Sequence, residues 1–182
     1  YYIASHNIDK RQLFAVSDFV ANFMLNKKKT DDSQYGYLVY KCDMVRDFFF
    51  AYYYINSFKY GCRENLSIFN CLFTPCINRF SLDLMNDNEN DELTVVNNMI
   101  SLFDELSSKQ KNQVIYLLGR VKHHESKNRA ISFLKKVYKE EGKHLYSNAY
   151  DANAIMLFRT AGVSLIYLKS YEHENEFYHI LI

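Results

Sequence analysis

The sequence is poor in residues that break helices. One proline and five glycines occur in 182 residues, whereas average proteins contain about 5% proline and 7% glycine. Proline removes a helical hydrogen bond and glycine adds backbone entropy to the unfolded chain, so their scarcity leaves long stretches free to form helices. We therefore predict an all-α chain built mainly from long helices.

Motifs that mark nucleotide sites and activated nucleophiles are missing. The sequence has no G-x-x-x-x-G-K-[ST], no G-x-G-x-x-G and no G-x-S-x-G, which excludes a phosphate loop and a nucleophile elbow from this stretch. Lys and Arg number 22 against 21 Asp and Glu, so the net charge does not indicate a nucleic-acid partner. We expect no catalytic residue and no cofactor within the chain.

Long apolar runs and close cysteine pairs are absent as well. The run FFFAYYYI is far shorter than the roughly 18 residues of a membrane span, so we expect a soluble, cytoplasmic protein without a membrane partner. The cysteines, which should be reduced and mostly buried, are Cys42, Cys62, Cys71 and Cys76. They include no C-x-x-C pair, and Cys71 and Cys76 alone do not supply the two close pairs that a structural zinc site would use.

What the sequence does contain is apolar side chains at helical spacing. Hydrophobic residues make up 48% and aromatic residues 16%, which is typical of a globular chain, and we assign most aromatic residues to the core. The chain starts at Tyr1 and stops within the apolar run EFYHILI, which favours an interior fragment of a larger protein.

Periodicity and capping signals predict the elements. Helices are expected at about residues 9–27, 43–59, just before Pro75, from Pro75 to Met85, 92–106, 108–122, 127–140, 151–169 and from near Glu174. One short strand is expected at Tyr37–Cys42, and a polar loop at residues 86–92. Asp9 with Gln12 and Ser107 with Gln110 are spaced as capping boxes, and Gly61 should end the second helix.

The order of these elements predicts three regions. Residues 1–60 are expected to form one module, residues 61–90 linking helices, and residues 91–182 a stack of helical hairpins that continues beyond the chain. No strict sequence period is present, so a superhelix of the tetratricopeptide or HEAT type is supported by the rhythm of the helices alone.

Several polar clusters have both a chemical and a structural interpretation. His123, His124 and Glu125 could form half of a metal site or an acid–base pair, but we favour a solvated helix connection. The alternating acids Asp87, Glu89 and Asp91 lack the glycine and the final glutamate of a calcium loop.

The basic residues also have two interpretations each. The run Lys27–Lys29 could contact phosphates, although a solvated helix end is the simpler interpretation. Four arginines lie in or beside apolar helix faces, where they should form ion pairs between helices or contact a ligand; they are Arg46, Arg79, Arg120 and Arg159.

The stretch YLVYKCDMVRDFFFAYYYINSF, residues 37–58, resembles a junction in STAND-type NTPases of the NACHT class. In that family the last strand of a winged-helix domain meets a helix of the form h-x-x-I-R-D-F-F-A-A-x-Y-I. The matching residues are Arg46, Asp47, Phe48, Phe49, Ala51 and Tyr54. Phe50 and Tyr52 are bulkier than the family's small residues, and the usual histidine before the helix is replaced by Lys41 or Cys42. The segments 113–122 and 157–170 look like helical sensor regions of bacterial STAND proteins of antiviral defence.

The resemblance implies a function for the chain as part of a larger ATPase. ATP and Mg²⁺ would bind upstream of Tyr1, an effector domain would lie further upstream, and this chain would couple recognition of a protein ligand to homo-oligomerisation. Two alternatives remain open. The chain could be a free-standing helical adaptor without a nucleotide switch, or a winged-helix protein that binds nucleic acid through residues 9–42.

Overall fold

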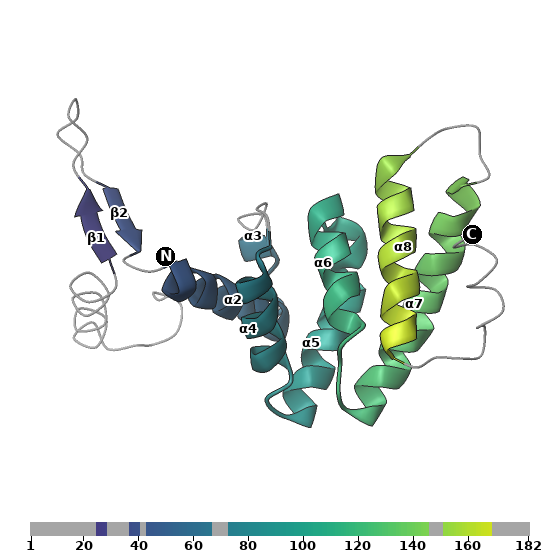
Figure 1. The fold of residues 1–182 in the computed structure, drawn as a ribbon. Helices are drawn as coiled ribbons and strands as arrows, with labels where there is room; N and C mark the ends of the chain where they lie inside the picture. The colour runs from purple at the N-terminus through teal and green to yellow at the C-terminus, as the bar shows by residue number, and fades with distance from the viewer. Residues whose placement is uncertain (1–24, 29–36, 41–42, 67–72, 146–150, 169–182) are drawn as a thin grey trace. The chain divides into compact units, whose positions relative to one another are not determined.

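The computed structural model describes residues 25–28, 37–40, 43–66, 73–145 and 151–168. Six main helices dominate this part of the chain (Figure 1), which confirms the prediction of an all-α fold. The elements in order are β1 (Leu25–Lys28), β2 (Tyr37–Tyr40), α2 (Asp43–Lys59), the short α3 (Arg63–Leu66), α4 (Pro75–Met85), α5 (Glu89–Leu102), the 3₁₀ turn η3 (Phe103–Glu105), α6 (Ser108–Leu118), α7 (His124–Leu145) and α8 (Ala152–Tyr167). The chain divides into two compact units, residues 1–49 and 50–182.

The first unit contains an antiparallel hairpin. Leu25 pairs with Tyr40 and Lys28 with Tyr37, so the strand expected near residue 37 is present and has a partner. The prediction of a single strand was wrong, because residues 25–27 were assigned to the end of a helix. A strand needs a neighbour to satisfy its backbone N–H and C=O groups, and this pairing overrides the local preference. The rest of that predicted helix lies outside the described residues.

Helix α2 has the bounds that the sequence predicts, and its end shows why. Gly61 adopts a left-handed φ of 64°. Its N–H donates to the carbonyl of Phe58 at 3.1 Å, and the N–H of Cys62 donates to the carbonyl of Ser57 at 2.8 Å. These two bonds form a Schellman motif, which satisfies carbonyls that the helix end would otherwise leave without donors.

Helix α2 buries its apolar side chains mainly on one face. Its buried apolar residues are Ala51, Tyr54, Ile55 and Phe58, which follow the i, i+3, i+4, i+7 spacing of a single helix face. Aromatic side chains off this face are partly exposed, including Phe48 at 39% and Tyr52 at 44%. Helix α2 thus carries more apolar side chains than its buried face covers.

Capping chemistry sets the boundaries of the following helices. The Thr74 hydroxyl accepts from the Ile77 N–H at 3.1 Å with Pro75 in the first helical turn, and Asn88 caps α5. The expected loop at 86–92 therefore shortens to 86–88. Ser107 and Gln110 form the predicted capping box of α6, and the helix ends at Leu118, four residues before the predicted Lys122.

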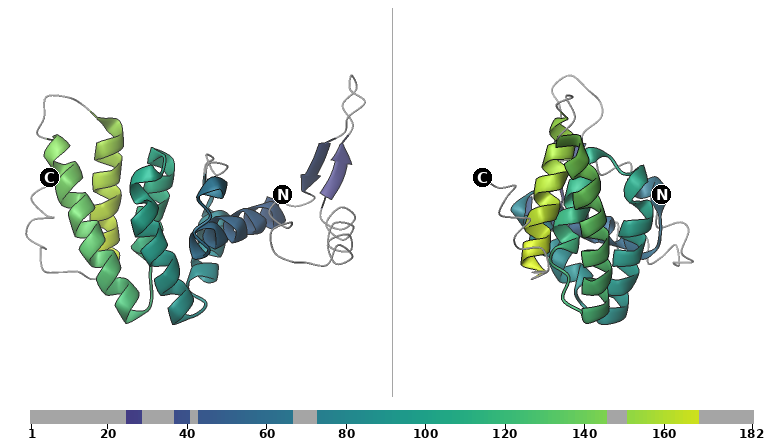
Figure 2. Two further views of the ribbon diagram at one scale, coloured as in Figure 1. Left: turned by 180° about the vertical axis from the view of Figure 1, so that it is seen from behind. Right: turned by 90° about the vertical axis from the view of Figure 1, so that its right-hand side faces the viewer.

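The last two helices form an antiparallel pair (Figures 1 and 2). Helix α7 begins at His124 and reaches Leu145, so it extends the predicted 127–140 at both ends and continues through Gly142. Helix α8 was predicted to begin at residue 151, and Asp151 is its cap, since its carboxylate accepts from the N–H groups of Asn153 and Ala154. A further helix expected near Glu174 lies outside the described residues.

The second unit has one continuous core. Helix α8 packs against both α6 and α7, while α7 also packs against α5. Core side chains come from every element between the second half of α2 and α8. The helices α6 and α8 cross closely at Gly119, where the Cβ of any larger residue would lie 2.4 Å from the Cβ of Ser164. This close approach explains why residue 119 is a glycine, and the bond from the Ser164 hydroxyl to the Ile115 carbonyl at 2.9 Å holds the two helices together there.

Candidate functional site

The junction residues all lie on α2, and they differ in burial. Ala51 and Tyr54 are fully buried, Asp47 is almost fully buried, and Phe48 is partly exposed. The Arg46 guanidinium donates to the Asp47 carboxylate at 2.9 Å and also pairs with Asp43 at 2.9 Å. The junction residues thus include a group of ion-paired side chains in the first half of α2 and two core residues, Ala51 and Tyr54, in its second half.

The C-terminal end of α2 is fastened to α5 by two polar contacts. The Lys59 ammonium lies 2.6 Å from the Asp91 carboxylate, and the Asn98 amide donates to the Phe58 carbonyl at 2.7 Å. The bond from Lys59, supported by one from Asn88, lowers the pKa of Asp91, and the same bond to Asp91 raises the pKa of Lys59. Helix α5 therefore holds the end of the junction helix on one of its sides.

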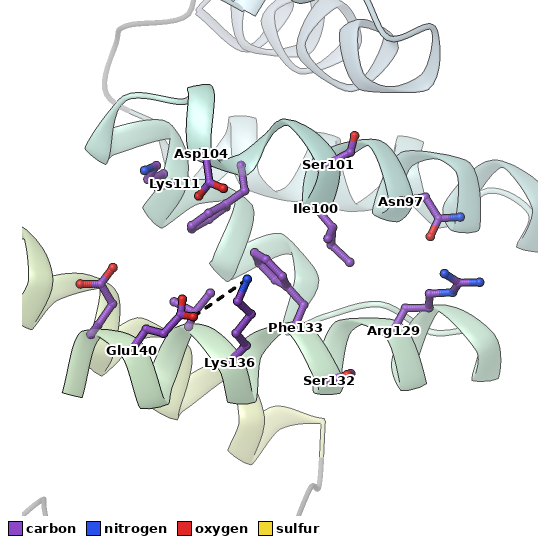
Figure 3. A pocket seen from close by; sticks show the side chains of 13 residues that line it. Asn97, Ile100, Ser101, Asp104, Lys111, Arg129, Ser132, Phe133, Lys136 and Glu140 are labelled. Carbon is purple, nitrogen blue, oxygen red and sulfur yellow. Dashed lines mark ion pairs between the residues drawn. The ribbon is translucent and has the colours of Figure 1, made fainter. Parts of the chain in front are cut away.

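An open groove of about 690 Å³ lies on another side of α5. Figure 3 shows the side chains of α5 and η3 facing those of α7 across it. Its apolar part is formed by Ile100, Phe103, Phe133 and Val137, and the rings of Phe103 and Phe133 meet edge to face with centroids 5.0 Å apart. Such an open surface suits a protein segment better than a small molecule, which would be enclosed on most sides.

Charged side chains line the same groove. They are Asp104, Lys111, Arg129, Lys136, Glu140 and Glu141. The Lys111 ammonium lies 5.3 Å from the centroid of the Phe103 ring. Arg129 pairs with Glu125 at 3.8 Å and Lys136 with Glu140 at 4.0 Å, and these side chains are more than half exposed. Exposed pairs at this distance are weak, so these charges are accessible to a partner.

Glu92 is a buried acid that the sequence did not reveal. It is fully buried, and its carboxylate oxygens accept from the backbone N–H groups of Lys122 at 2.9 Å and His123 at 3.0 Å. These bonds connect α5 to the residues between α6 and α7, whose buried N–H groups need acceptors. The signal was available, because Glu92 precedes Val95, Val96 and Met99 at core spacing.

The structure places the remaining candidates apart from any shared site. His124 and Glu125 belong to the first turn of α7 instead of a loop. Glu89 and Asp91 lie in the first turn of α5, and Lys27 and Lys28 lie in β1 instead of at a helix end. The described residues contain no group of three histidine, cysteine, aspartate or glutamate side chains that could hold a metal ion.

The arginine and cysteine predictions were partly wrong. Arg120 stacks between the rings of Tyr116 and Tyr167, at 3.6 and 4.3 Å from their centroids, while Arg79 and Arg159 are exposed. At the edge of an apolar helix face, an arginine can pack its aliphatic stem on the face and keep its guanidinium in water, so it needs no ion-pair partner. Cys62 is half-buried and Cys76 exposed, because both lie near helix ends; Cys42 and Cys71 lie outside the described residues.

None of the helices in the described ranges is long and apolar enough to cross a membrane. No family model, curated protein or solved structure matches this chain.

Proposed function

We propose that this chain is the ligand-sensing helical segment of a STAND-type NTPase, in which binding of a protein ligand is coupled to oligomerisation and effector activation. In this proposal α2 is the junction helix that leaves the winged-helix domain, and α5–α8 begin a superhelix of the tetratricopeptide or HEAT type. ATP and Mg²⁺ bind in the upstream part of the parent protein, and the chain itself contributes no catalytic group.

The observation that carries the proposal is the position of α5. One side of this helix holds the end of α2 through Asp91 and Asn98, and another side lines the groove through Asn97 and Ile100. Asn97 and Asn98 are adjacent in sequence, so a ligand in the groove acts on the helix that also holds the junction helix. A ligand shifts such a switch only if it binds one state more tightly than the other.

The coding sequence upstream of Tyr1 gives the first test. A nucleotide-binding module of ordinary domain size should place a phosphate loop within about 300 codons. The second test is ATP binding by the full-length protein, which should be lost when the phosphate-loop lysine is replaced by alanine. The proposal fails if no such loop is encoded there.

The alternative is a free-standing adaptor without a nucleotide switch. The groove supports this function as well as it supports that of a STAND sensor. An adaptor would bind its partner through α5 and α7 without any nucleotide. It would therefore show the same affinity for the partner with ATP, with ADP and without nucleotide, whereas a STAND sensor would bind its ligand differently in these three conditions.

A further inference from the structure

We propose that the groove between α5 and α7 binds one amphipathic helix of the protein ligand, and that an acidic side chain, an apolar stripe and a basic side chain follow one another along the contacting face of that helix. This inference rests on the proposed function, because it specifies the chemistry of the ligand that the segment recognises.

The two walls of the groove have the spacing of helix ridges. Asn97, Ile100 and Asp104 form one wall at positions i, i+3 and i+7, and Figure 3 shows them opposite a second ridge on α7. That ridge includes Arg129 and Phe133 at i and i+4. A third helix can place its own ridge of side chains between two such rows.

The centre of the groove has an apolar floor with one ammonium group beside it. Ile100 and Phe133 are half-buried against the core, and the Phe133 ring meets the buried ring of Phe103. Lys136 lies beside Phe133 and pairs with Glu140 (Figure 3). Leucine side chains from a ligand helix would cover the exposed parts of Ile100 and Phe133, which provides the hydrophobic share of binding.

The two ends of the groove differ in charge. Arg129 lies at the same end as Asn97, and Asp104 and Glu140 lie at the other (Figure 3). Two lysines also lie toward the acidic end: Lys111 lies over the Phe103 ring and Lys136 pairs with Glu140. Asp104 is therefore the acid of this end to which we assign a base of the ligand. The ligand helix should therefore direct an acid at Arg129 and a base at Asp104. Because Asn97 and Asp104 are seven residues apart along the chain, the ligand charges should be separated by about 10 Å, or two helical turns.

Synthetic helices can test this arrangement with the whole chain. The first probe is a fluorescein-labelled, alanine-based helical peptide whose contacting face carries glutamate, leucines and lysine in that order. The second replaces its glutamate by lysine, and the third keeps the composition of the first but moves the leucines to the opposite face. Fluorescence anisotropy measures the dissociation constant of each probe.

The native chain should bind the first probe about fivefold more tightly than either of the others, which is the effect expected of one favourable charge contact or a lost apolar stripe. The variant Arg129→Glu should reverse the order of the first two probes. Arg129→Gln should remove the preference without adding a carboxylate beside Glu125. Arg79→Glu, on the exposed surface of α4, should leave the order of all three probes unchanged.

Equal binding of the three probes by the native chain would overturn the inference. An unchanged order of the first two probes in Arg129→Glu, with native circular dichroism, would overturn it too. Neither result touches the proposed function, which fails instead if the upstream sequence lacks a phosphate loop.

Discussion

Single residues in this chain make contacts that reach beyond their own helix. Gly119 lies where α6 and α8 cross, Glu92 holds the connection that leads into α7, and Gly61 turns the chain after α2. At Gly119 and Glu92 one atom or one carboxylate decides whether two segments fit together, and at Gly61 the left-handed backbone allows the chain to turn. Substitutions at these positions should therefore reduce the free energy of unfolding by more than the exposure or the residue type alone would suggest.

Replacing Gly119 by alanine should destabilise the protein. The added methyl group would lie 2.4 Å from the Ser164 Cβ and 2.8 Å from its Cα, so the helices must move apart at a cost of about 1–3 kcal/mol. Urea unfolding followed by circular dichroism measures the change. Gly142→Ala is the matched control, because its methyl group meets only the edge of the Phe158 ring at 3.1 Å and alanine favours the helix by about 1 kcal/mol. Equal losses in both variants would contradict the close crossing.

Replacing Glu92 by alanine should also weaken folding. The change leaves the N–H groups of Lys122 and His123 without their acceptor in a buried place, which costs about 1–3 kcal/mol for each such group. Hydrogen exchange should show faster exchange at these two amides. Glu89→Ala, at an exposed position in the first turn of α5, serves as the control and should leave both amides protected. Unchanged protection in Glu92→Ala would show that the carboxylate is not their acceptor.

At the scale of elements, local chemistry determines where helices begin and end. The Schellman turn at Gly61, the capping box at Ser107 and the cap at Asp151 were predictable because each depends on a few neighbouring residues. The spacing of Glu92 with Val95, Val96 and Met99 indicates its burial, but not its hydrogen-bond partners. Those partners, the stacking of Arg120 and the groove itself depend on which helices meet, and a single sequence does not contain that information. The strand at Leu25–Lys28 was missed for the same reason, since it exists through its pairing partner.

Gly61→Ala tests the end of α2. Nothing lies within 4 Å of the position that a side chain would occupy, so the only cost is the left-handed backbone at φ 64°. That conformation costs a non-glycine residue about 1–2 kcal/mol, and thermal unfolding should show a lower midpoint. A midpoint equal to that of the native protein would mean that the turn takes another conformation in solution.

The ion pair between α2 and α5 predicts a dependence of stability on pH. The pKa of Asp91 is lowered in the folded state, so the contribution of the pair is present above the ordinary pKa of about 3.9 and is lost as the pH falls through the lowered value. The pKa of Lys59 is raised, so its contribution is present below about 10.4 and is lost as the pH rises through the raised value. Both side chains are about one-third exposed, which limits the effect to about 1 kcal/mol or less.

The measurement is a comparison of the native protein with Asp91→Asn by urea unfolding at pH 7 and at pH 3. The difference between the two proteins should shrink at pH 3, because the carboxylate of the unfolded chain, with its pKa of about 3.9, is then mostly protonated. A difference that stays constant between the two pH values would show that the ion pair does not form.

At the scale of the whole molecule, the chain contains two units of different size. The core from α2 to α8 is continuous, and the division falls within α2, between Phe49 and Phe50. The expected boundaries after residues 60 and 90 stay predictions, although the shared core crosses both positions.

A shortened chain can test the independence of the larger unit. A protein beginning at Asp43, which keeps the whole of α2, should fold cooperatively with a thermal midpoint within a few degrees of that of the full chain. Calorimetry checks this, with the equality of calorimetric and van't Hoff enthalpies as the criterion for one cooperative unit. A broad transition without cooperativity would show that the larger unit depends on residues 1–42.

The bonds of Glu92 have a consequence for how such a chain can be re-engineered. Consensus repeat proteins tolerate the removal or duplication of a unit because neighbouring repeats meet through identical surfaces. Here a carboxylate on α5 serves the connection between α6 and α7. A designer who shortens or extends this array must transplant both partners together, so its modules are defined by shared hydrogen bonds and not by the limits of individual hairpins.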